Sequence, residues 1–579
     1  MHRPNPKFFL VQKAENAHEL DSFECTLNRY WDVTGEEPSH SIVLNQSILL
    51  VYGDWVNPSA VDADDFSLSK FLADLKGHCI VVLVESEKVK VVSSYFSFLP
   101  VYYLQEKKVV SNHWEAIVPF SNHAIDELFV IESHLFNYPL GESTIYQDVK
   151  VLDSFSVLEM DREEFKFNVL VDISGWFPAQ VDDSIGLDAL AQQFISSIEP
   201  YFTSERELIT FTSGFDGRTI LASALAFKKE VYTFSMGRME NDDVYNPKSN
   251  AEELKIPFET IDLASDKYQS KFFHCAKRMS EISGGRNGFL YPHFYYCTDY
   301  FNSYPVMHTG YCGSELFRAL HVAGAVTSKE LVSIFLEEDE GKLREIILQS
   351  KRLRFIQPNV IERNETALWK RIDSIRSMRN QFNNTNHFFY YFIFKEVFRK
   401  VFGFWTTTQF ENIKVRTPFL DISFIQLLLR SAYAGCNNSF FTHNPLKRYK
   451  GQLLYAQILK TLHSPLFQLM TGKNYKPSQL LSVHGQMSIV LPYIKKKWRK
   501  KKTIPNIDNL GLITGFKQSW EALNPRLDNL SEIYSLDDIQ RASREMHPNM
   551  SEVERDMLFQ IASLSLTLKD DEIVGANRL

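Results

Sequence analysis

The residues from 208 to 228 have the types and spacing of an anion-binding turn. Residues 208–212 form a short apolar, β-branched run that predicts a buried strand, and residues 218–228 carry apolar side chains at helical spacing. Between them lies the turn Ser213-Gly214-Phe215-Asp216-Gly217. The first N–H groups of a helix are unpaired and the helix dipole adds positive charge, so a phosphate is the expected ligand. Asp216 would repel that phosphate unless a divalent cation lay between them, and Mg²⁺ prefers carboxylate and phosphate oxygens.

The alternative is an ordinary strand-to-helix turn, whose two glycines only permit tight packing. Short glycine-rich turns are weak signals by themselves. The stretch contains neither of the two common nucleotide loops, G-x-x-x-x-G-K-[ST] and G-x-G-x-x-G. Both interpretations remain open on this stretch alone.

Three stretches, in order along the chain, resemble one family. Thr212 to Gly217 resembles the S-G-G-x-D-S pyrophosphate loop of the ATP pyrophosphatases. Residues 310–317 (GYCGSELF) resemble the G-E-G-x-D-E-L-F motif of the asparagine synthetase family, and residues 415–421 (VRTPFLD) resemble its V-R-x-P-F-L-D motif. The similarity spans most of the chain. It implies an enzyme that activates a carboxylate as its acyl-AMP, releases pyrophosphate and passes the acyl group to an amine.

The resemblance also implies a set of site residues, with ATP and Mg²⁺ as cofactors. The nucleotide would be held by Thr212, Ser213, Gly214, Phe215, Asp216, Gly217, Arg218, Ser235 and Gly310. Arg218 would add positive charge to the pyrophosphate cradle, and the backbone at Ser235 would hold adenine. The magnesium ligands would be Asp216 and either Glu315 or Ser314, which stands where the family has aspartate. Lys473 matches the family's lysine that stabilises the intermediate, and Lys476 is the alternative match. Either residue could instead be an ordinary solvent-exposed loop lysine without a catalytic role. We therefore expect Lys473, Asp216 and Glu315 to be catalytic.

The expected fold is α/β with an α+β N-terminal part, divided into four regions. Residues 1–120 are β-rich and resemble a class II glutamine amidotransferase domain, an Ntn-hydrolase-like β-sandwich, over residues 71–112. His2 stands where that domain needs cysteine, so we expect it to lack its nucleophile. Residues 121–185 are expected to be a connector. Residues 186–480 alternate strands and helices, which predicts a doubly wound parallel sheet of the ATP pyrophosphatase (adenine-nucleotide α-hydrolase-like) type with added helices. Residues 481–579 are expected to be a C-terminal helical extension.

Composition narrows the classes of protein further. The chain has 579 residues, enough for two or three domains, and its net charge of −8 argues against nucleic-acid binding. The six cysteines form no C-x-x-C pair, so neither a zinc site nor a disulfide framework is indicated. No run of eighteen apolar residues is present, so we expect a cytoplasmic protein with no membrane contact. The basic run Lys495 to Lys502 would dock an acidic or phosphate-rich partner, or be a solvated helix face.

The leading hypothesis is an ATP-dependent, glutamine-independent amide ligase. Its substrates would be a small-molecule or peptide carboxylate and an amine, and its role would lie in peptide, natural-product or glycan modification. The sequence leaves open whether the protein forms a homodimer. The alternative is a nucleotide- or partner-binding pseudoenzyme, favoured by Ser314, Lys414 and Gly217, which depart from the family pattern. Convergence of Asp216 and Lys473 on one pocket would favour catalysis. A Lys473 that points to solvent would favour the binding protein. Arg416 and Asp421 are expected to pair with each other structurally.

Overall fold

The structure is a computed structural model that describes most of the chain. The described residues are 9–13, 23–25, 30–56, 58, 61–162, 164–239, 241–286, 288–318, 326–437, 450–489, 511–548 and 550–568. His2 and the basic run Lys495 to Lys502 lie outside them. No helix among the described residues is long and apolar enough to cross a membrane.

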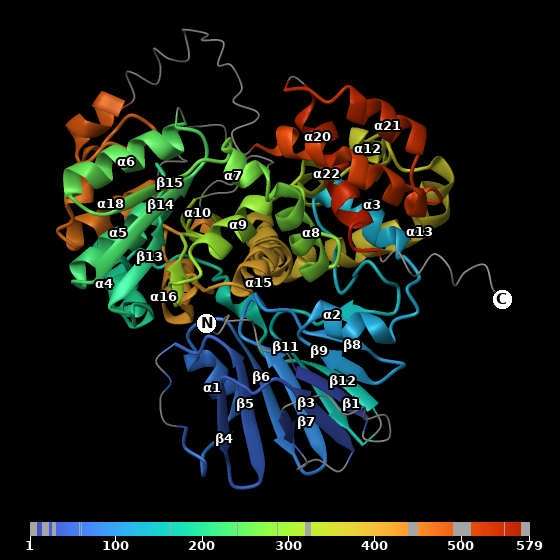
Figure 1. The fold of residues 1–579 in the computed structure, drawn as a ribbon. Helices are drawn as coiled ribbons and strands as arrows, with labels where there is room; N and C mark the ends of the chain where they lie inside the picture. Colours follow the sequence, from blue (N-terminus) through green and yellow to red (C-terminus); the bar gives the residue numbers. More distant parts are fainter. Residues whose placement is uncertain are drawn as a thin grey trace.

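Two antiparallel six-stranded sheets form the N-terminal part, in the lower half of Figure 1. The first has the order β10-β8-β9-β1-β3-β2 and the second β12-β11-β7-β6-β5-β4. The first comprises β1 (Phe9–Lys13), β2 (Phe23–Cys25), β3 (Trp31–Gly35), β8 (Tyr102–Leu104), β9 (Val109–Ser111) and β10 (Lys150–Val151). The second comprises β4 (His40–Val43), β5 (Ser47–Gly53), β6 (Cys79–Glu85), β7 (Lys88–Ser93), β11 (Ser156–Asp161) and β12 (Glu164–Val169). Their inner faces pack together, as the rings of Phe9 and Tyr52, 5.0 Å apart, illustrate.

Both faces of the central strand β6 are buried, which explains its unbroken apolar sequence. Val82 and Val84 face the core between the sheets, whereas Val81 and Leu83 belong to a second cluster on the outer face. Leu72 of helix α1 (Leu68–Asp74) lies in that second cluster. Successive side chains of a strand point to opposite faces, so a strand covered on both sides carries no polar alternation.

The N-terminal sheets continue past residue 120, which corrects the expected domain boundary. Strands β10, β11 and β12 lie between residues 150 and 169, and β11 pairs with β7 in antiparallel register. Helix α3 (Glu127–Phe136) contacts α11 (Lys329–Leu336) and α13 (Pro358–Ser377). The stretch from 121 to 185 is therefore part of the folded body and not a connector.

A five-stranded parallel sheet forms the second part, at the upper left of Figure 1. Its order is β15-β14-β13-β16-β17. The strands are β13 (Arg206–Thr210), β14 (Glu230–Met236), β15 (Phe258–Ile261), β16 (Val306–His308) and β17 (Lys414–Arg416). Helix α5 (Asp216–Ala226) packs on β13 and β14, and α6 (Asp242–Leu254) packs on β14 and β15. The direction of strand addition reverses between β13 and β16, and ligands of parallel α/β sheets bind at the carboxyl ends at such a reversal.

Helices make up most of the remaining described residues. They include α8 (Phe272–Ile282), α9 (Pro292–Tyr300), α10 (Gly313–Phe317), α12 (Glu340–Leu348), α15 (Phe404–Phe410), α16 (Ile422–Arg430) and α18 (Lys450–Thr461). An eleven-residue π-helix, η7, runs from Ile393 to Gly403. The C-terminal helices α20 (Leu512–Leu523), α21 (Leu536–Arg544) and α22 (Glu552–Ser565) lie at the upper right of Figure 1. One cluster of buried apolar side chains extends from Phe9 to Leu568, so the sheets and helices share a core.

Residues 414–421 join the N-terminal sheets to the parallel sheet. Arg416 Nε donates to Asp54 Oδ2 at 2.6 Å, and its Nη2 donates to Oδ1 at 3.1 Å. Asp421 pairs with Lys76 and accepts from the backbone N–H of Phe424 at the start of α16. Arg416 and Asp421 therefore do not pair with each other as expected, because each binds a side chain of the N-terminal region.

Candidate functional site

The loops after β13 and β16 meet where the strand order reverses. Gly310, two residues after β16, lies against Asp216, the first residue of α5. A Cβ at Gly310 would lie 2.5 Å from Asp216 Cβ, and one at Gly313 would lie 2.8 Å from Asp216 Oδ1. Only glycine permits this approach, so the two loops form one site around Asp216.

The turn before α5 is open to solvent on one side and anchored on the other. Thr212 and Gly214 are exposed, whereas Phe215 is buried with its ring 5.3 Å from that of Tyr455. A Cβ at Gly217 would overlap the carbonyl oxygen of Thr210, so glycine lets the first turn of α5 pack on the end of β13. The first N–H groups of α5 and the exposed turn thus lie at the same edge of the sheet, which suits an anion.

Hydroxyl groups surround the Asp216 carboxylate. Ser314 Oγ donates to Asp216 Oδ2 at 2.6 Å, and the buried Tyr455 hydroxyl of α18 donates to Oδ1. Burial and the charge of Asp216 raise the pKa of Tyr455 well above its usual value, so this hydroxyl stays protonated. The Arg318 guanidinium donates to Ser314 Oγ. Burial opposes the charge on Arg318, but Asp216 raises its pKa, so the cluster carries a fixed cation.

Glu315 supplies a second carboxyl group beside Asp216. It lies in the first turn of α10 and is half-buried. Burial, followed by the charge of Asp216, raises the pKa of Glu315 to about 7. No group of three or more His, Cys, Asp or Glu side chains is placed to hold a metal among the residues described. Two carboxyl groups and a hydroxyl still fit Mg²⁺, which binds one or two carboxylates together with phosphate oxygens and water.

The side chain of Arg218 does not reach the turn, which corrects its expected role in the cradle. It is fully buried and donates to the carbonyl oxygens of Leu466, Leu469 and Met470, at 3.2, 3.5 and 2.8 Å. Burial lowers the pKa of Arg218 to about 10. Arg218 therefore fixes residues 466–470 against α5 instead of adding charge to the phosphate site.

The segment fixed by Arg218 brings Lys473 beside the turn. Asn250 of α6 also donates to the Met470 carbonyl, at 3.1 Å, and the N–H of Gly472 donates to the Ser213 carbonyl at 3.3 Å. Lys473 is the next residue and is exposed, which by itself favours the binding protein over catalysis. Lys476 is also exposed, but lies beyond the buried Tyr475 and at the start of the 3₁₀ turn Pro477–Leu481. The backbone contact is made one residue before Lys473, which favours Lys473 over Lys476.

Ser235 belongs to the frame of the site through its side chain. Its buried hydroxyl donates to the Asp243 carbonyl oxygen at 2.6 Å, and the Asp243 carboxylate accepts from Ser213 Oγ. The first turn of α6 is thereby tied both to β14 and to the turn before α5. The structure thus brings together the turn, Gly310, Ser314, Glu315 and the segment that carries Lys473.

Sequence reasoning missed Tyr455 and Arg318, the two side chains that complete the Asp216 cluster. Tyr455 lies within α18, 239 residues from Asp216, in a stretch with no motif. Arg318 directly follows the second motif, GYCGSELF, and this closeness to Ser314 in the sequence was an available signal.

No protein-family model matches the sequence, and no curated protein matches it. The chain is similar to the solved structure of the allosteric regulatory enzyme of purine biosynthesis, at 10% identity and a TM-score of 0.18. It is also similar to glutamine phosphoribosylpyrophosphate amidotransferase from B. subtilis complexed with ADP and GMP, at 10% identity and a TM-score of 0.17. Each match covers 44% of this chain and 59% of the other. TM-scores this low establish no shared fold, so the fold rests on the strand order itself.

Proposed function

We propose that this protein is an ATP- and Mg²⁺-dependent ligase that adenylates a carboxylate and transfers it to an amine without glutamine. The supporting observation is the contact between Asp216 and the loop of Gly310 to Glu315 at the strand-order reversal of a parallel sheet. This position is where parallel α/β sheets bind nucleotides. The proposal also rests on the resemblance of these two loops to the asparagine synthetase family. We also propose that the N-terminal part has an Ntn-hydrolase-like fold and that the parallel sheet is of the ATP pyrophosphatase type.

Each residue has a separate role in the proposed reaction. The backbone of the turn at Ser213 and Gly214 and the first N–H groups of α5 would hold the phosphates. Asp216 and Glu315 would hold Mg²⁺, which when bound neutralises phosphate charge. Lys473, placed beside Ser213 by the Gly472 contact, would stabilise the negative charge that develops when the amine attacks. Asn241, Ser235 and Asp243 would keep the loops in place.

Glutamine independence is supported by the state of five of the six cysteines. Cys79, Cys275, Cys297, Cys312 and Cys436 are buried. Burial raises the pKa of all five thiols, which leaves them protonated. A protonated thiol is a poor nucleophile, so none of these five would attack the amide of glutamine.

The test is pyrophosphate release from ATP in the presence of Mg²⁺ and a panel of amino acids, peptides and uronic acids. Wild type should release pyrophosphate only with a particular carboxylate, and Asp216→Asn should abolish the release. Asp537→Asn, which changes an exposed aspartate in the first turn of α21, is the matched control and should behave as wild type. Release that is equal in wild type and Asp216→Asn would refute the proposal.

A nucleotide-binding pseudoenzyme is the second candidate, and the Asp216 cluster supports it specifically. Both carboxylate oxygens of Asp216 already accept hydroxyl hydrogen bonds, from Ser314 and Tyr455. Glu315, with a pKa near 7, would be only partly ionised at neutral pH. A metal must displace these protons and hydrogen bonds, which weakens binding. ATP binding without pyrophosphate release from any acid would favour this candidate.

A further inference from the structure

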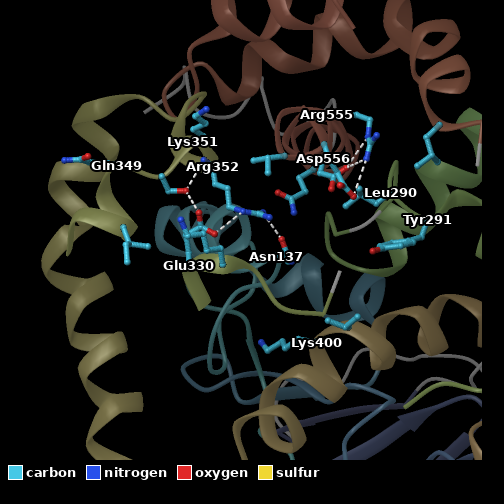
Figure 2. A pocket seen from close by; sticks show the side chains of 18 of the residues that line it. Asn137, Leu290, Tyr291, Glu330, Gln349, Lys351, Arg352, Lys400, Arg555 and Asp556 are labelled. Carbon is cyan, nitrogen blue, oxygen red and sulfur yellow. Dashed lines mark hydrogen bonds and ion pairs between the residues drawn. The ribbon is translucent and has the colours of Figure 1, made fainter. Parts of the chain in front are cut away.

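Two arginines of the helical region show how the protein neutralises a partly buried guanidinium. Both line a cavity of about 1060 Å³ bordered by α11, α12 and α22 (Figure 2). Arg352 Nε lies 3.3 Å from Glu330 Oε2, and its Nη1 donates to the side chain of Asn137 at 2.8 Å. Arg555 Nη2 lies 3.1 Å from Asp556 Oδ1. Each of these cations is thus paired with a carboxylate of the protein itself.

Arg318, at the C-terminal end of α10, is bonded differently. Its Nη2 donates to Ser314 Oγ, which in turn donates to Asp216 Oδ2 at 2.6 Å. Among the described residues no carboxylate forms an ion pair with Arg318, so the guanidinium is linked to Asp216 through the Ser314 hydroxyl. The charge of Arg318 is therefore not cancelled by a directly bonded carboxylate.

The guanidinium of Arg318 also retains donors that the protein does not use. Arginine carries five N–H donors in a planar fork. Nε is buried without a hydrogen-bond partner, whereas Nη1 makes no hydrogen bond to the described residues and is not buried. The residue as a whole is partly exposed. A ligand that enters the site from solvent can therefore reach Nη1.

The backbone and the stem of Arg318 are held from two sides. The Tyr390 hydroxyl of α14 (Thr385–Phe392) donates to the Arg318 carbonyl oxygen at 2.8 Å. A Cβ at Gly451, in α18, would lie 3.0 Å from Arg318 Cγ, so glycine lets that helix pack against the stem. A long side chain that is already held in place loses less conformational entropy when a ligand binds.

Arg318 lies near both the Asp216 cluster and the segment that carries Lys473. Burial works against the charge on Arg318, but Asp216 and, more weakly, Tyr475 are among the groups that raise its pKa. Tyr475 lies two residues after Lys473, and its ring is 6.3 Å from that of Phe215 in the turn before α5. Arg318 therefore adjoins the turn, the carboxylate and the lysine segment of the proposed ATP site.

We propose that Arg318 binds a phosphate group of the nucleotide directly, as a cation supplied by the chain itself, an inference that rests on the proposed ATP site. Charge-assisted hydrogen bonds from a guanidinium suit phosphate oxygens. Asp216 and Glu315 place negative charge where the triphosphate would lie, and a neighbouring cation offsets part of the repulsion. Because this charge belongs to a side chain, its contribution does not depend on Mg²⁺.

The test measures ATP binding by calorimetry, first with Mg²⁺ and then with an excess of chelator. Arg318→Gln should weaken binding by roughly ten- to a hundredfold under both conditions, the value of hydrogen bonds to a charged group. Arg318→Lys keeps the charge and should recover part of the loss. Arg555→Gln is the matched control and should bind ATP as wild type does, since Arg555 is also partly buried but is bonded to Asp556.

The outcomes separate this inference from the proposed function. If Arg318→Gln binds ATP as tightly as wild type while Asp216→Asn does not bind, the role of Arg318 is rejected and the nucleotide site stands. A loss of affinity seen only with Mg²⁺ would make Arg318 a support for the magnesium ligands and would overturn a direct phosphate contact. No ATP binding by wild type under either condition would reject the nucleotide site and this inference with it.

A chemical measurement on wild type covers the case in which Arg318→Gln fails to fold. Phenylglyoxal modifies accessible guanidinium groups, and mass spectrometry gives the rate of modification at Arg318 with and without ATP. Bound ATP should slow the modification of Arg318 and leave that of Arg555 unchanged. Equal rates at Arg318 with and without ATP would reject the inference.

Discussion

The buried pair Asp54–Arg416 gives the sharpest stability prediction. Arg416 is 5% exposed and Asp54 3% exposed, with donor–acceptor distances of 2.6 and 3.1 Å. Asp54→Asn would remove the counter-charge but leave one oxygen to accept from Arg416. Removing one partner of a buried pair costs roughly 3–5 kcal/mol, and the retained acceptor places this variant near the lower figure. Lys414→Met removes a 42% exposed partner 3.6 Å from the same carboxylate and should cost about 1 kcal/mol or less.

The two variants are compared by urea and thermal unfolding at neutral pH. Asp54→Asn should lower both midpoints clearly, and Lys414→Met hardly at all. The loss should depend on pH in a defined direction. Burial works against the charge on Asp54, but the bonds from Arg416 hold its pKa below the usual 3.8. The pair thus stabilises the fold above pH 3.8, and this contribution is lost as the pH falls through the lower folded-state pKa. Equal midpoints for Asp54→Asn and Lys414→Met would refute the conclusion that residues 414–421 hold the N-terminal sheets against the parallel sheet.

Three further predictions concern the site and the core. Gly310→Ala should abolish ATP binding, because the added Cβ would lie 2.5 Å from the Cβ of Asp216. Gly175→Ala is the control: no atom lies within 4 Å of its added Cβ, so its ATP-binding isotherm should match that of wild type. Ser314→Asp should lower the melting temperature in the absence of Mg²⁺, because like charges about 4 Å apart repel by about 4 kcal/mol at an effective dielectric constant near 20, and the charge of Arg318 offsets only part of this. Adding Mg²⁺ should raise the melting temperature of this variant more than that of wild type. Equal rises in the two proteins would contradict a metal site there. Burial raises the pKa of Glu132 from 4.5 to about 7. The unfolded chain therefore loses this proton first, and stability falls as the pH rises from 4.5 to about 7 and is level above that. Glu132→Gln should remove this loss, on the order of 3 kcal/mol, and parallel pH profiles for the two proteins would reject the prediction.

The strands and the turn at 213–217 could be predicted because their signals are local. The run at 208–212 corresponds to β13 (Arg206–Thr210), and the helix expected at 218–228 corresponds to α5 (Asp216–Ala226). A buried parallel strand needs only a short apolar run, and a helix needs an apolar stripe, so each is visible within a window of about a dozen residues. Strand β17 was missed as a member of the sheet, because only three residues pair and its motif lies far from the other strands.

What the sequence could not reveal depends on contacts between distant positions. Asp54 and Arg416 are 362 residues apart, and Tyr455 and Asp216 are 239 apart. Arg218 was assigned to the phosphate site because it follows the turn, but on a helix its side chain points to the opposite side, toward residues 466–470. Strands β10 and β11 were hidden in the supposed connector because their partners β8 and β7 lie before residue 112, and β12 extends the sheet from β11. None of these contacts has a local signal in the chain.

The most direct test of the central claim is titration of the protein with ATP by calorimetry, with Mg²⁺ and then with a chelator. The account predicts one site whose affinity depends on Mg²⁺ and is lost in Asp216→Asn, while Asp537→Asn binds as wild type. Binding that is indifferent to both Mg²⁺ and Asp216, or no binding at all, would contradict a nucleotide site at the junction of the β13 and β16 loops.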